Sequence, residues 1–201
     1  MSNQALAALQ QRRSIYALGR SIEQSNEQVR DLILEAVRQS PSSFNSQSSR
    51  VVVLFNEQHE KFWGFVKAKL AAYAKDAESA AKTNAKIDSF AAGVGSVLFF
   101  EDQDVVKGLQ SNFPSYADNF PIWSEHSTAM AQLAVWTVLS QANIGASLQH
   151  YNPIVDDQVA AEWDIPANWT LRAQLVFGSI EGEPKDKTFV DDAARFKVFG
   201  L

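Results

Sequence analysis

The sequence contains no cysteine. Disulfide bonds, thiolate nucleophiles and cysteine-based zinc or iron–sulfur sites are therefore excluded. Two glycine-rich patterns that hold nucleotide phosphates in many proteins, Gly-x-Gly-x-x-Gly and the P-loop, are also absent. A phosphate-bearing ligand would therefore need a different cradle. The three histidines, His59, His126 and His150, lack the spacing of metal ligands, so we expect no metal site.

Long apolar runs and an excess of positive charge are also missing. No run approaches the roughly 20 apolar residues of a membrane-spanning helix. Near the start, the basic pair Arg12-Arg13 follows the apolar stretch, which is the wrong order for a signal peptide. The formal net charge of −5 argues against nucleic acid or an anionic membrane as a partner, because both require concentrated Lys and Arg. We expect a cytoplasmic protein with neither partner, although a few local cations could still bind a phosphate.

The size and composition are those of one globular domain. The chain has 201 residues, of which 46% are hydrophobic and 20% are charged. A chain of this length buries most of its surface on folding, and it is too apolar for disorder. We therefore expect a single domain over residues 1–201. Its last segment, 188–201, carries too little apolar surface to fold alone, and its Phe and Val side chains require a partner surface.

Hydrophobic periodicity predicts helices and strands in an irregular order. Ser25 to Gln28 form a capping-box pattern at the start of one helix, and Pro41 ends it. The apolar character of 123–143 on all sides indicates a central helix, with Gly145 at its end. We expect His126 to be buried in that helix and His59 to be exposed. The expected helices are 2–12, 25–40, 56–73, 76–86 and 123–143, and the expected strands are 50–55, 94–100 and 171–177, the first two buried. This order predicts an α+β fold with a mixed β-sheet sandwiched by helices.

Three polar clusters interrupt these periodic segments. Arg12-Arg13-Ser14 offers guanidinium forks and a hydroxyl, which suit phosphate oxygens. The loop 42–47 is dense in hydroxyl and amide groups that could line a flat heterocycle. Lys185 and Lys187 point the same way from an extended segment and could meet one phosphate. Each cluster taken alone has a simpler interpretation, namely a solvated helix end, a serine-rich connection and a charged turn.

Taken together and in order, these segments resemble the FMN-dependent nitroreductase family. The stretches 14–19 and 145–153 resemble more specifically its short, fatty-acid-repression branch. The resemblance extends over essentially the whole chain, and its four motifs, 12–19, 41–47, 145–153 and 182–187, occur in register. It implies the family fold, which is an intertwined homodimer with two shared sites and a C-terminal tail that reaches the partner subunit. One stretch departs from the pattern, because Leu148-Gln149-His150-Tyr151 stands where other members carry Pro-x-Glu-Gly.

The resemblance also implies the role of each motif. Arg12, Arg13 and Ser14 would hold the phosphate and ribityl chain of non-covalent FMN, and Lys185 and Lys187 would close on that phosphate. The loop 42–47 would line the isoalloxazine ring at a subunit interface, and the 149–150 loop would give a backbone donor near the reactive nitrogen. The implied cofactor-binding residues are Arg12, Arg13, Ser14, Tyr16, Ser42, Ser43, Asn45, Gln47, Gln149, His150, Lys185 and Lys187. Asn84 and Lys86 are loose candidates for the pyrimidine edge.

The implied activity is reduction of small oxidised acceptors, such as nitroaromatics and quinones, with NADH or NADPH. The flavin would carry the chemistry, so no side chain is expected to act as a catalytic residue. Hydride would pass to the flavin and then to the acceptor by ping-pong exchange. Phe120 and Trp123 are candidates for a planar substrate slot, or alternatively anchors of the core and the dimer interface. A non-catalytic flavin-binding sensor or regulatory protein is the alternative function, since its pocket would look identical.

Overall fold

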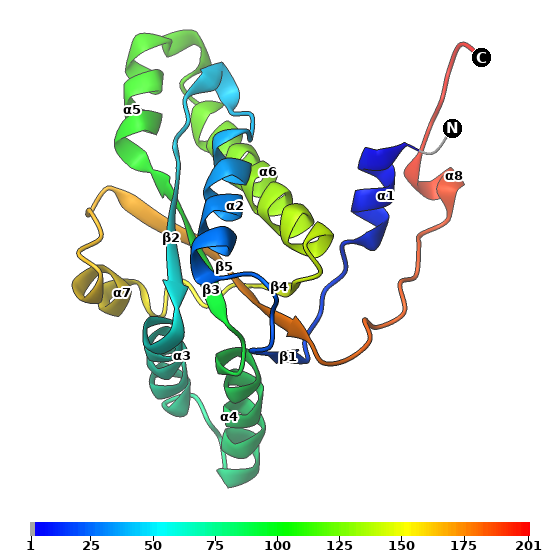
Figure 1. Ribbon diagram of the computed structural model, residues 1–201. Coiled ribbons are helices and arrows are strands. Elements are labelled where there is room, and N and C mark those ends of the chain that lie inside the picture. The colour runs from blue at the N-terminus through cyan, green and yellow to red at the C-terminus, as the bar shows by residue number, and fades with distance from the viewer. Residues whose placement is uncertain (1–2) are drawn as a thin grey trace.

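A five-stranded sheet forms the centre of the computed structural model, which describes residues 3–201 (Figure 1). Its strand order is β1-β5-β3-β2, and β4 also pairs with β5. Every pairing between these strands is antiparallel. The strands are β1 (Leu18–Gly19), β2 (Ser49–Phe55), β3 (Gly95–Asp102), β4 (Gly145–Gln149) and β5 (Trp169–Ile180).

Helices cover both faces of this sheet (Figure 1). They are α1 (Gln4–Gln11), α2 (Asn26–Arg38), α3 (Asn56–Ala71), α4 (Ala77–Ala91), α5 (Gln103–Asn112), α6 (Phe120–Gln141), α7 (Asp156–Glu162) and α8 (Asp192–Arg195). Two short 3₁₀ turns, η1 (Ser43–Asn45) and η2 (Pro114–Tyr116), complete the secondary structure. The Ser2 at which we expect the first helix to start lies outside the described residues.

The two faces of the sheet bury two separate cores. Successive side chains of a strand point to opposite faces. On β3, Val97 and Phe99 therefore join the core under α2 and α6. Leu98 and Phe100 join the other core, with side chains of α3, α4 and α7. The expected α+β class with helices on both sides of a sheet is confirmed.

Local sequence signals explain several element boundaries. At the start of α2, the Ser25 hydroxyl accepts the Gln28 N–H at 3.3 Å, and the Gln28 side chain accepts the Ser25 N–H at 2.8 Å. This reciprocal pair is the predicted capping box, and it satisfies two N–H groups that the first helical turn leaves open. The central helix is also confirmed, as α6.

Four details differ from the sequence-based expectations. The sheet is antiparallel between its strands rather than mixed, and the one parallel pairing within residues 3–201 is the isolated bridge between Ser14 and Ala146. β2 is half-buried rather than buried, because it lies at the edge of the sheet. Gly145 begins β4 instead of ending α6, and its lack of a side chain serves packing, since a Cβ there would meet Ile15 and Ile180 about 3.0 Å away. Finally, α4 continues to Ala91 and buries Phe90.

The burial of two histidines is the reverse of what we expect from sequence. His59 is 0% exposed, and its Nδ1 lies 3.0 Å from the Ser96 hydroxyl oxygen, to which Trp63 Nε1 also donates. Burial lowers the pKa of His59 to about 4. His126 is instead exposed on α6. Apolar residues occur on all sides of α6, so the helical pattern does not reveal which side faces the core.

The C-terminal segment extends away from the body of the molecule. Beyond β5 the chain forms only the four-residue α8, and Figure 1 shows this segment leaving the sheet beside α1. Its large apolar side chains are open to solvent, with Phe199 87% exposed. This agrees with the expectation that the tail cannot bury itself. None of the helices within residues 3–201 has the length and apolar character that a membrane crossing needs.

Candidate functional site

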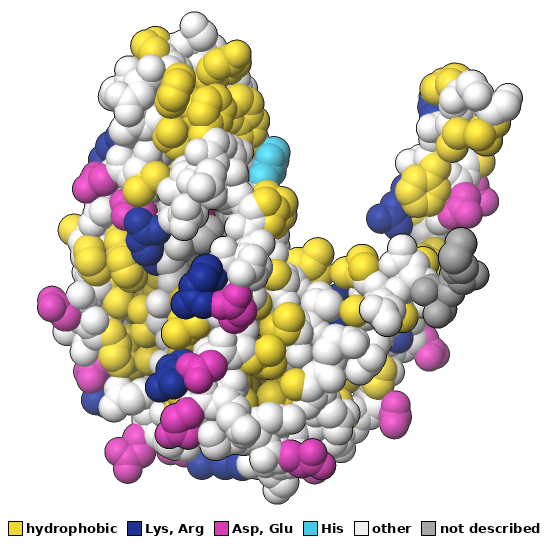
Figure 2. All heavy atoms as spheres, turned by 45° about the horizontal axis from the view of Figure 1, so that its top comes forward, with side chains coloured by type: hydrophobic (Ala, Val, Ile, Leu, Met, Phe, Trp, Pro, Cys, Tyr) yellow, Lys and Arg dark blue, Asp and Glu magenta, His cyan; other side chains and the backbone are white. Residues whose placement is uncertain are grey.

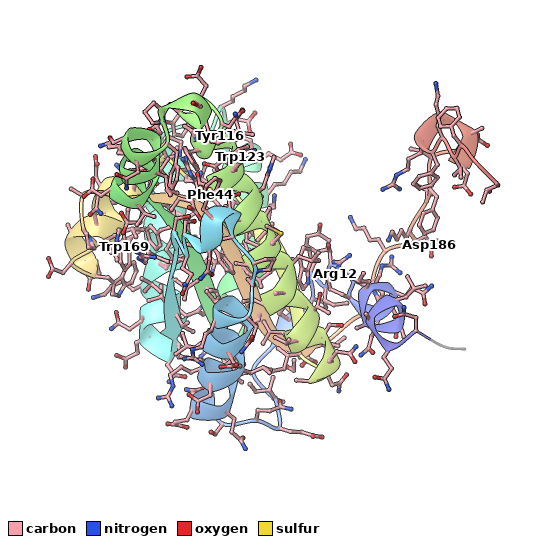
Figure 3. The ribbon with its side chains drawn as sticks, turned by 90° about the horizontal axis from the view of Figure 1, so that it is seen from above. Arg12, Phe44, Tyr116, Trp123, Trp169 and Asp186 are labelled. Carbon is pink, nitrogen blue, oxygen red and sulfur yellow. The ribbon has the colours of Figure 1, made fainter. Side chains whose placement is uncertain are left out.

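Segments 12–16 and 185–187, from the first and last parts of the chain, meet in a pocket of about 280 Å³. α1 ends at Gln11, and the following residues extend along the sheet edge, where the Ile15 N–H donates to the Ala146 carbonyl at 2.9 Å. The segment after β5 runs beside them. Seven residues line the pocket: Arg12, Arg13, Ser14, Tyr16, Lys185, Asp186 and Lys187. Figure 3 shows Arg12 and Asp186 from these two segments near one another.

One backbone hydrogen bond and one side-chain contact join the two segments of this pocket. The Glu181 N–H donates to the Ala17 carbonyl at 3.0 Å, and the Arg13 guanidinium donates to the Lys185 carbonyl. Lys185 also places its ammonium 5.6 Å from the centre of the Tyr16 ring. The five residues predicted to hold a phosphate and its ribityl chain, Arg12, Arg13, Ser14, Lys185 and Lys187, are therefore brought together with Tyr16, which was predicted as cofactor-binding without a defined place. We call these six residues the phosphate clamp.

Charge in the clamp is strongly unbalanced. Four cationic side chains line the pocket with a single carboxylate, that of Asp186. Partial burial lowers the pKa of Arg12, and the neighbouring charge of Arg13 lowers it further. Crowded cations favour an anion between them, and guanidinium forks match phosphate oxygens. The donor set therefore fits a phosphate group.

The serine-rich loop has a well-defined shape of its own. Phe44, Asn45 and Gln47 have φ near +50 to +57°, a left-handed conformation that is uncommon outside glycine. The Ser42 hydroxyl accepts the Gln47 N–H at 2.9 Å, and the Ser43 N–H reaches the Ser127 hydroxyl on α6 at 3.4 Å. This second group, the serine loop (42–47), is thus fixed by local contacts and by α6.

A buried carboxylate anchors the end of the serine loop. Glu101 of β3 is 0% exposed, and it accepts hydrogen bonds from the hydroxyls of Ser48 at 2.6 Å and Ser49 at 2.5 Å. Burial raises the pKa of Glu101, and the two hydroxyls oppose that change. Sequence reasoning missed this residue, because a single carboxylate near the end of an otherwise apolar strand gives no signal of its partners.

Aromatic side chains surround the tip of the serine loop (Figure 3). The Phe44 ring lies 4.9 Å from Phe113, 5.3 Å from Phe120 and 6.2 Å from Trp123, centre to centre. Phe120 is only 2% exposed, so it supports this cluster from below. Trp123 is half-buried and Tyr116 is exposed. Of the two substrate candidates, Trp123 alone offers an accessible ring in this chain.

The loop after β4 contains the other predicted residues. Gln149 is half-buried and donates to the Ser147 hydroxyl at 3.1 Å, whereas His150 is exposed. The buried Gln174 of β5 supports the next turn by accepting the Tyr151 N–H at 2.7 Å and donating to Asn152 at 3.2 Å. The position of Gln174 in an alternating strand gave no indication of this role.

The phosphate clamp and the serine loop do not meet in one chain. They contact α6 at different points, since Ser127 receives the loop and Trp136 receives Arg12. These positions are nine residues apart, which is about 14 Å along a helix. Figure 3 shows Phe44 and Arg12 well separated across α6. Asn84 and Lys86 lie on α4, and they line neither the clamp nor the pocket that Ser42, Gln47 and Ser127 help to form at the serine loop.

An apolar groove lies beside the clamp. α1, α2 and α6 enclose about 550 Å³ there, and Leu9, Met130 and Leu133 contribute exposed side chains. Exposed apolar patches of this kind mark sites of association. Figure 2 shows a wide hollow between the body of the molecule and the projecting part that contains α1 and α8, with hydrophobic side chains on both sides.

The chain resembles known proteins over nearly its full length. A family model described as the nitroreductase family matches residues 9–179. Two Saccharomyces cerevisiae proteins match closely, HBN1 with 35% identity over 92% of each chain and the nitroreductase FRM2 with 34% identity over 93% of each.

Solved structures agree with these relatives. Nitroreductase CinD from Lactococcus lactis, in complex with chloramphenicol, superimposes with a TM-score of 0.89. It is 49% identical, and the match covers 98% of this chain and 100% of that one. CinD was also solved with 4-nitrophenol. The resemblance of the motifs, the sheet with helices on both faces and these full-length matches all agree: the chain belongs to the nitroreductase family.

Proposed function

We propose that this oxidoreductase binds FMN non-covalently and uses NADH or NADPH to reduce nitroaromatic, quinone or similar small acceptors. The observation that carries the proposal is the phosphate clamp, in which four cations and one carboxylate line a single pocket. FMN ends in a phosphate, and membership of the nitroreductase family favours FMN as the ligand whose phosphate binds in the clamp. When bound, the flavin supplies hydride transfer, so that reductant and acceptor react in turn by ping-pong exchange.

The residues of this chain would bind and orient the cofactor. Arg12, Arg13, Lys185 and Lys187 would pair with the phosphate, while Ser14 and Tyr16 add hydroxyl groups. Ser42, Ser43, Asn45 and Gln47 would line the ring, and the backbone of Gln149 and His150 would donate near its reactive nitrogen. Trp123, at the edge of the aromatic cluster, would present a flat surface to planar acceptors. The complex of CinD with 4-nitrophenol supports nitroaromatics as one acceptor class.

We further propose that the complete site forms in a homodimer. The points where the clamp and the serine loop contact α6 are about 14 Å apart, and the Phe44 tip of the loop is 52% exposed, so a second chain would supply the surface that encloses the ring. The exposed apolar groove and the exposed tail supply the surfaces for a partner. An obligate dimer of this kind buries well over ~2,000 Å² in total. Light scattering should give a dimer at micromolar concentration, and a monomer with FMN bound would contradict the arrangement.

Two measurements on the purified protein test the function. Its absorption spectrum should show bound oxidised flavin, which heat or acid releases intact as FMN. Oxidation of NADH or NADPH should then depend on an added nitroaromatic or quinone, with parallel lines in double-reciprocal plots. A colourless protein that does not bind added FMN overturns the proposal. Bound FMN without turnover of either nicotinamide supports the alternative, a flavin-binding sensor.

A further inference from the structure

Within the phosphate clamp, the Arg12 guanidinium contacts an aromatic ring of α6. Its guanidinium carbon lies 4.4 Å from the centre of the Trp136 ring on α6. Among residues 3–201, no residue forms a hydrogen bond or an ion pair with the Arg12 side chain. The ring face of Trp136 is thus its defined side-chain contact. Arg13, in contrast, donates to the Lys185 carbonyl.

We infer that Trp136 is a positioning residue of the phosphate clamp, which fixes the Arg12 guanidinium by stacking against it. This inference rests on the proposed function. A cation over an aromatic face is attracted by the ring, and the interaction strengthens when it is shielded from water. Stacking uses the face of the guanidinium and leaves its N–H edge available for phosphate oxygens. A carboxylate partner would instead occupy that edge.

The surroundings of Trp136 support this role. α1 is tied to α6 one turn further on, where Gln11 donates to the Ser140 carbonyl at 2.9 Å and accepts from Gln141 at 2.7 Å. Arg12 follows directly, so the stacked ring fixes the first residue beyond that anchor. The Trp136 indole N–H is buried and has no hydrogen-bond acceptor within residues 3–201. The ring face, and not the N–H group, is therefore what Trp136 offers to the clamp.

The test compares FMN with riboflavin, which lacks the phosphate, in fluorescence titrations of the full-length apoprotein. Trp136→Leu removes the aromatic face and should weaken FMN binding roughly 2- to 30-fold. Riboflavin affinity should change less than about 2-fold, because the effect acts through the phosphate. Trp136→Phe keeps a smaller ring and should retain more FMN affinity than Trp136→Leu.

A double-mutant cycle separates positioning from general structural damage. In an Arg12→Ala background, Trp136→Leu should cause no further loss of FMN affinity, because the cation it holds is gone. In an Arg13→Ala background, the matched control, its full effect should remain. If Trp136→Leu fails to fold, as judged by circular dichroism, Trp136→Phe carries the same cycle.

Three results overturn the inference while leaving the proposed function intact. They are unchanged FMN affinity in Trp136→Leu, equal losses for FMN and riboflavin, and additivity with Arg12→Ala. A wild-type chain that binds neither flavin overturns the proposed function, and this inference with it. The two failures are thus distinguished by the wild-type titration.

Discussion

The phosphate clamp and the serine loop are held in shape in different ways. In the clamp, segments about 170 residues apart in the sequence are joined by backbone hydrogen bonds, such as that from Glu181 to Ala17, and by the contact of Arg13 with Lys185. The serine loop is shaped by contacts within a few residues, and by Ser127 and Glu101. The clamp is a complete pocket in one chain, whereas the tip of the loop, Phe44, is exposed beside the exposed rings of Phe113 and Tyr116.

This difference implies a division of labour. In the proposed function, binding the phosphate would be a property of the folded chain, because the four cations already line one pocket. Enclosing the flat ring would be a property of the proposed dimer, because the loop would need a second surface opposite it. Variants that affect one half should therefore be distinguishable from variants that affect the other, and four experiments can break or sharpen this comparison.

The largest effect is expected from separating the subunits. Leu133 is 44% exposed in the apolar groove, and Leu133→Glu would bury an unpaired charge in the proposed interface. Such a charge costs several kcal/mol, so the dimer dissociation constant should rise by more than about 100-fold. Both flavins should be lost with the dimer, since the ring pocket disappears. Tyr73→Glu, at a 70% exposed residue outside the groove, is the control and should remain dimeric in light scattering.

Removing a cation from the clamp should weaken FMN selectively. Arg12→Ala or Lys187→Ala removes a charge-assisted hydrogen bond of about 1.5–3 kcal/mol, which is roughly a 10- to 150-fold loss of affinity. Riboflavin, which we expect to bind the native protein poorly because it lacks the phosphate, should be affected much less. Turnover of the FMN-saturated variants should stay near normal. Unchanged FMN affinity would mean that the clamp is only a solvated helix end and a charged turn, and a collapse of turnover alone would place these residues at the wrong end of the cofactor.

Acid should destabilise the whole fold, and it should not act selectively on the phosphate clamp or on the serine loop. Burial lowers the pKa of His59 to about 4 from an ordinary 6.5, so below pH 6.5 the unfolded chain binds a proton that the folded chain does not. The contribution of the neutral His59 to the free energy of unfolding is therefore fully present above pH 6.5, and it is lost as the pH falls from 6.5 towards 4. Between pH 7 and pH 5 the loss is about 2 kcal/mol. Thermal melting across these pH values should show it, and His59→Gln should flatten the slope.

The smallest effect is expected in the serine loop. Asn45→Ala removes one neutral hydrogen-bonding side chain, worth about 0.5–1.5 kcal/mol or roughly 2- to 13-fold in affinity. FMN and riboflavin should weaken equally, because the change lies at the ring and not at the phosphate. Titration of the two flavins against this variant checks the prediction. A loss confined to FMN would show that the loop and the clamp do not divide the cofactor as we propose.

Much of the fold could be predicted where a signal is local. The Ser25–Gln28 capping box is read directly from residue types three apart. The alternating strand around Leu175 was visible for the same reason, since side-chain direction repeats every two residues. The clamp residues were found through motifs at both ends of the chain, and the structure brings those residues together.

Features that depend on tertiary packing could not be predicted in this way. The pattern of α6 does not show which side faces the core, so the expected burial of His126 was wrong. The burial of His59 depends on a distant residue, Ser96 of β3, which Trp63 of the same helix α3 also contacts. The edge position of β2 is set by topology and not by its β-branched residues. Supporting residues such as Glu101 and Gln174 were missed because polar residues within strands reveal their partners only after folding.

The extended segment after β5 has a consequence for how the protein behaves on dilution. Lys185 and Lys187 belong to the same stretch of chain as the exposed tail, with no helix or strand between Ile180 and α8 to isolate them. In the proposed dimer, docking of the tail on a partner would also fix these two lysines. Thermodynamic linkage then makes cofactor retention depend on protein concentration, because FMN binding and dimerisation each favour the other. Dilute enzyme would lose activity by shedding its flavin, and excess FMN would restore both the cofactor and the dimer.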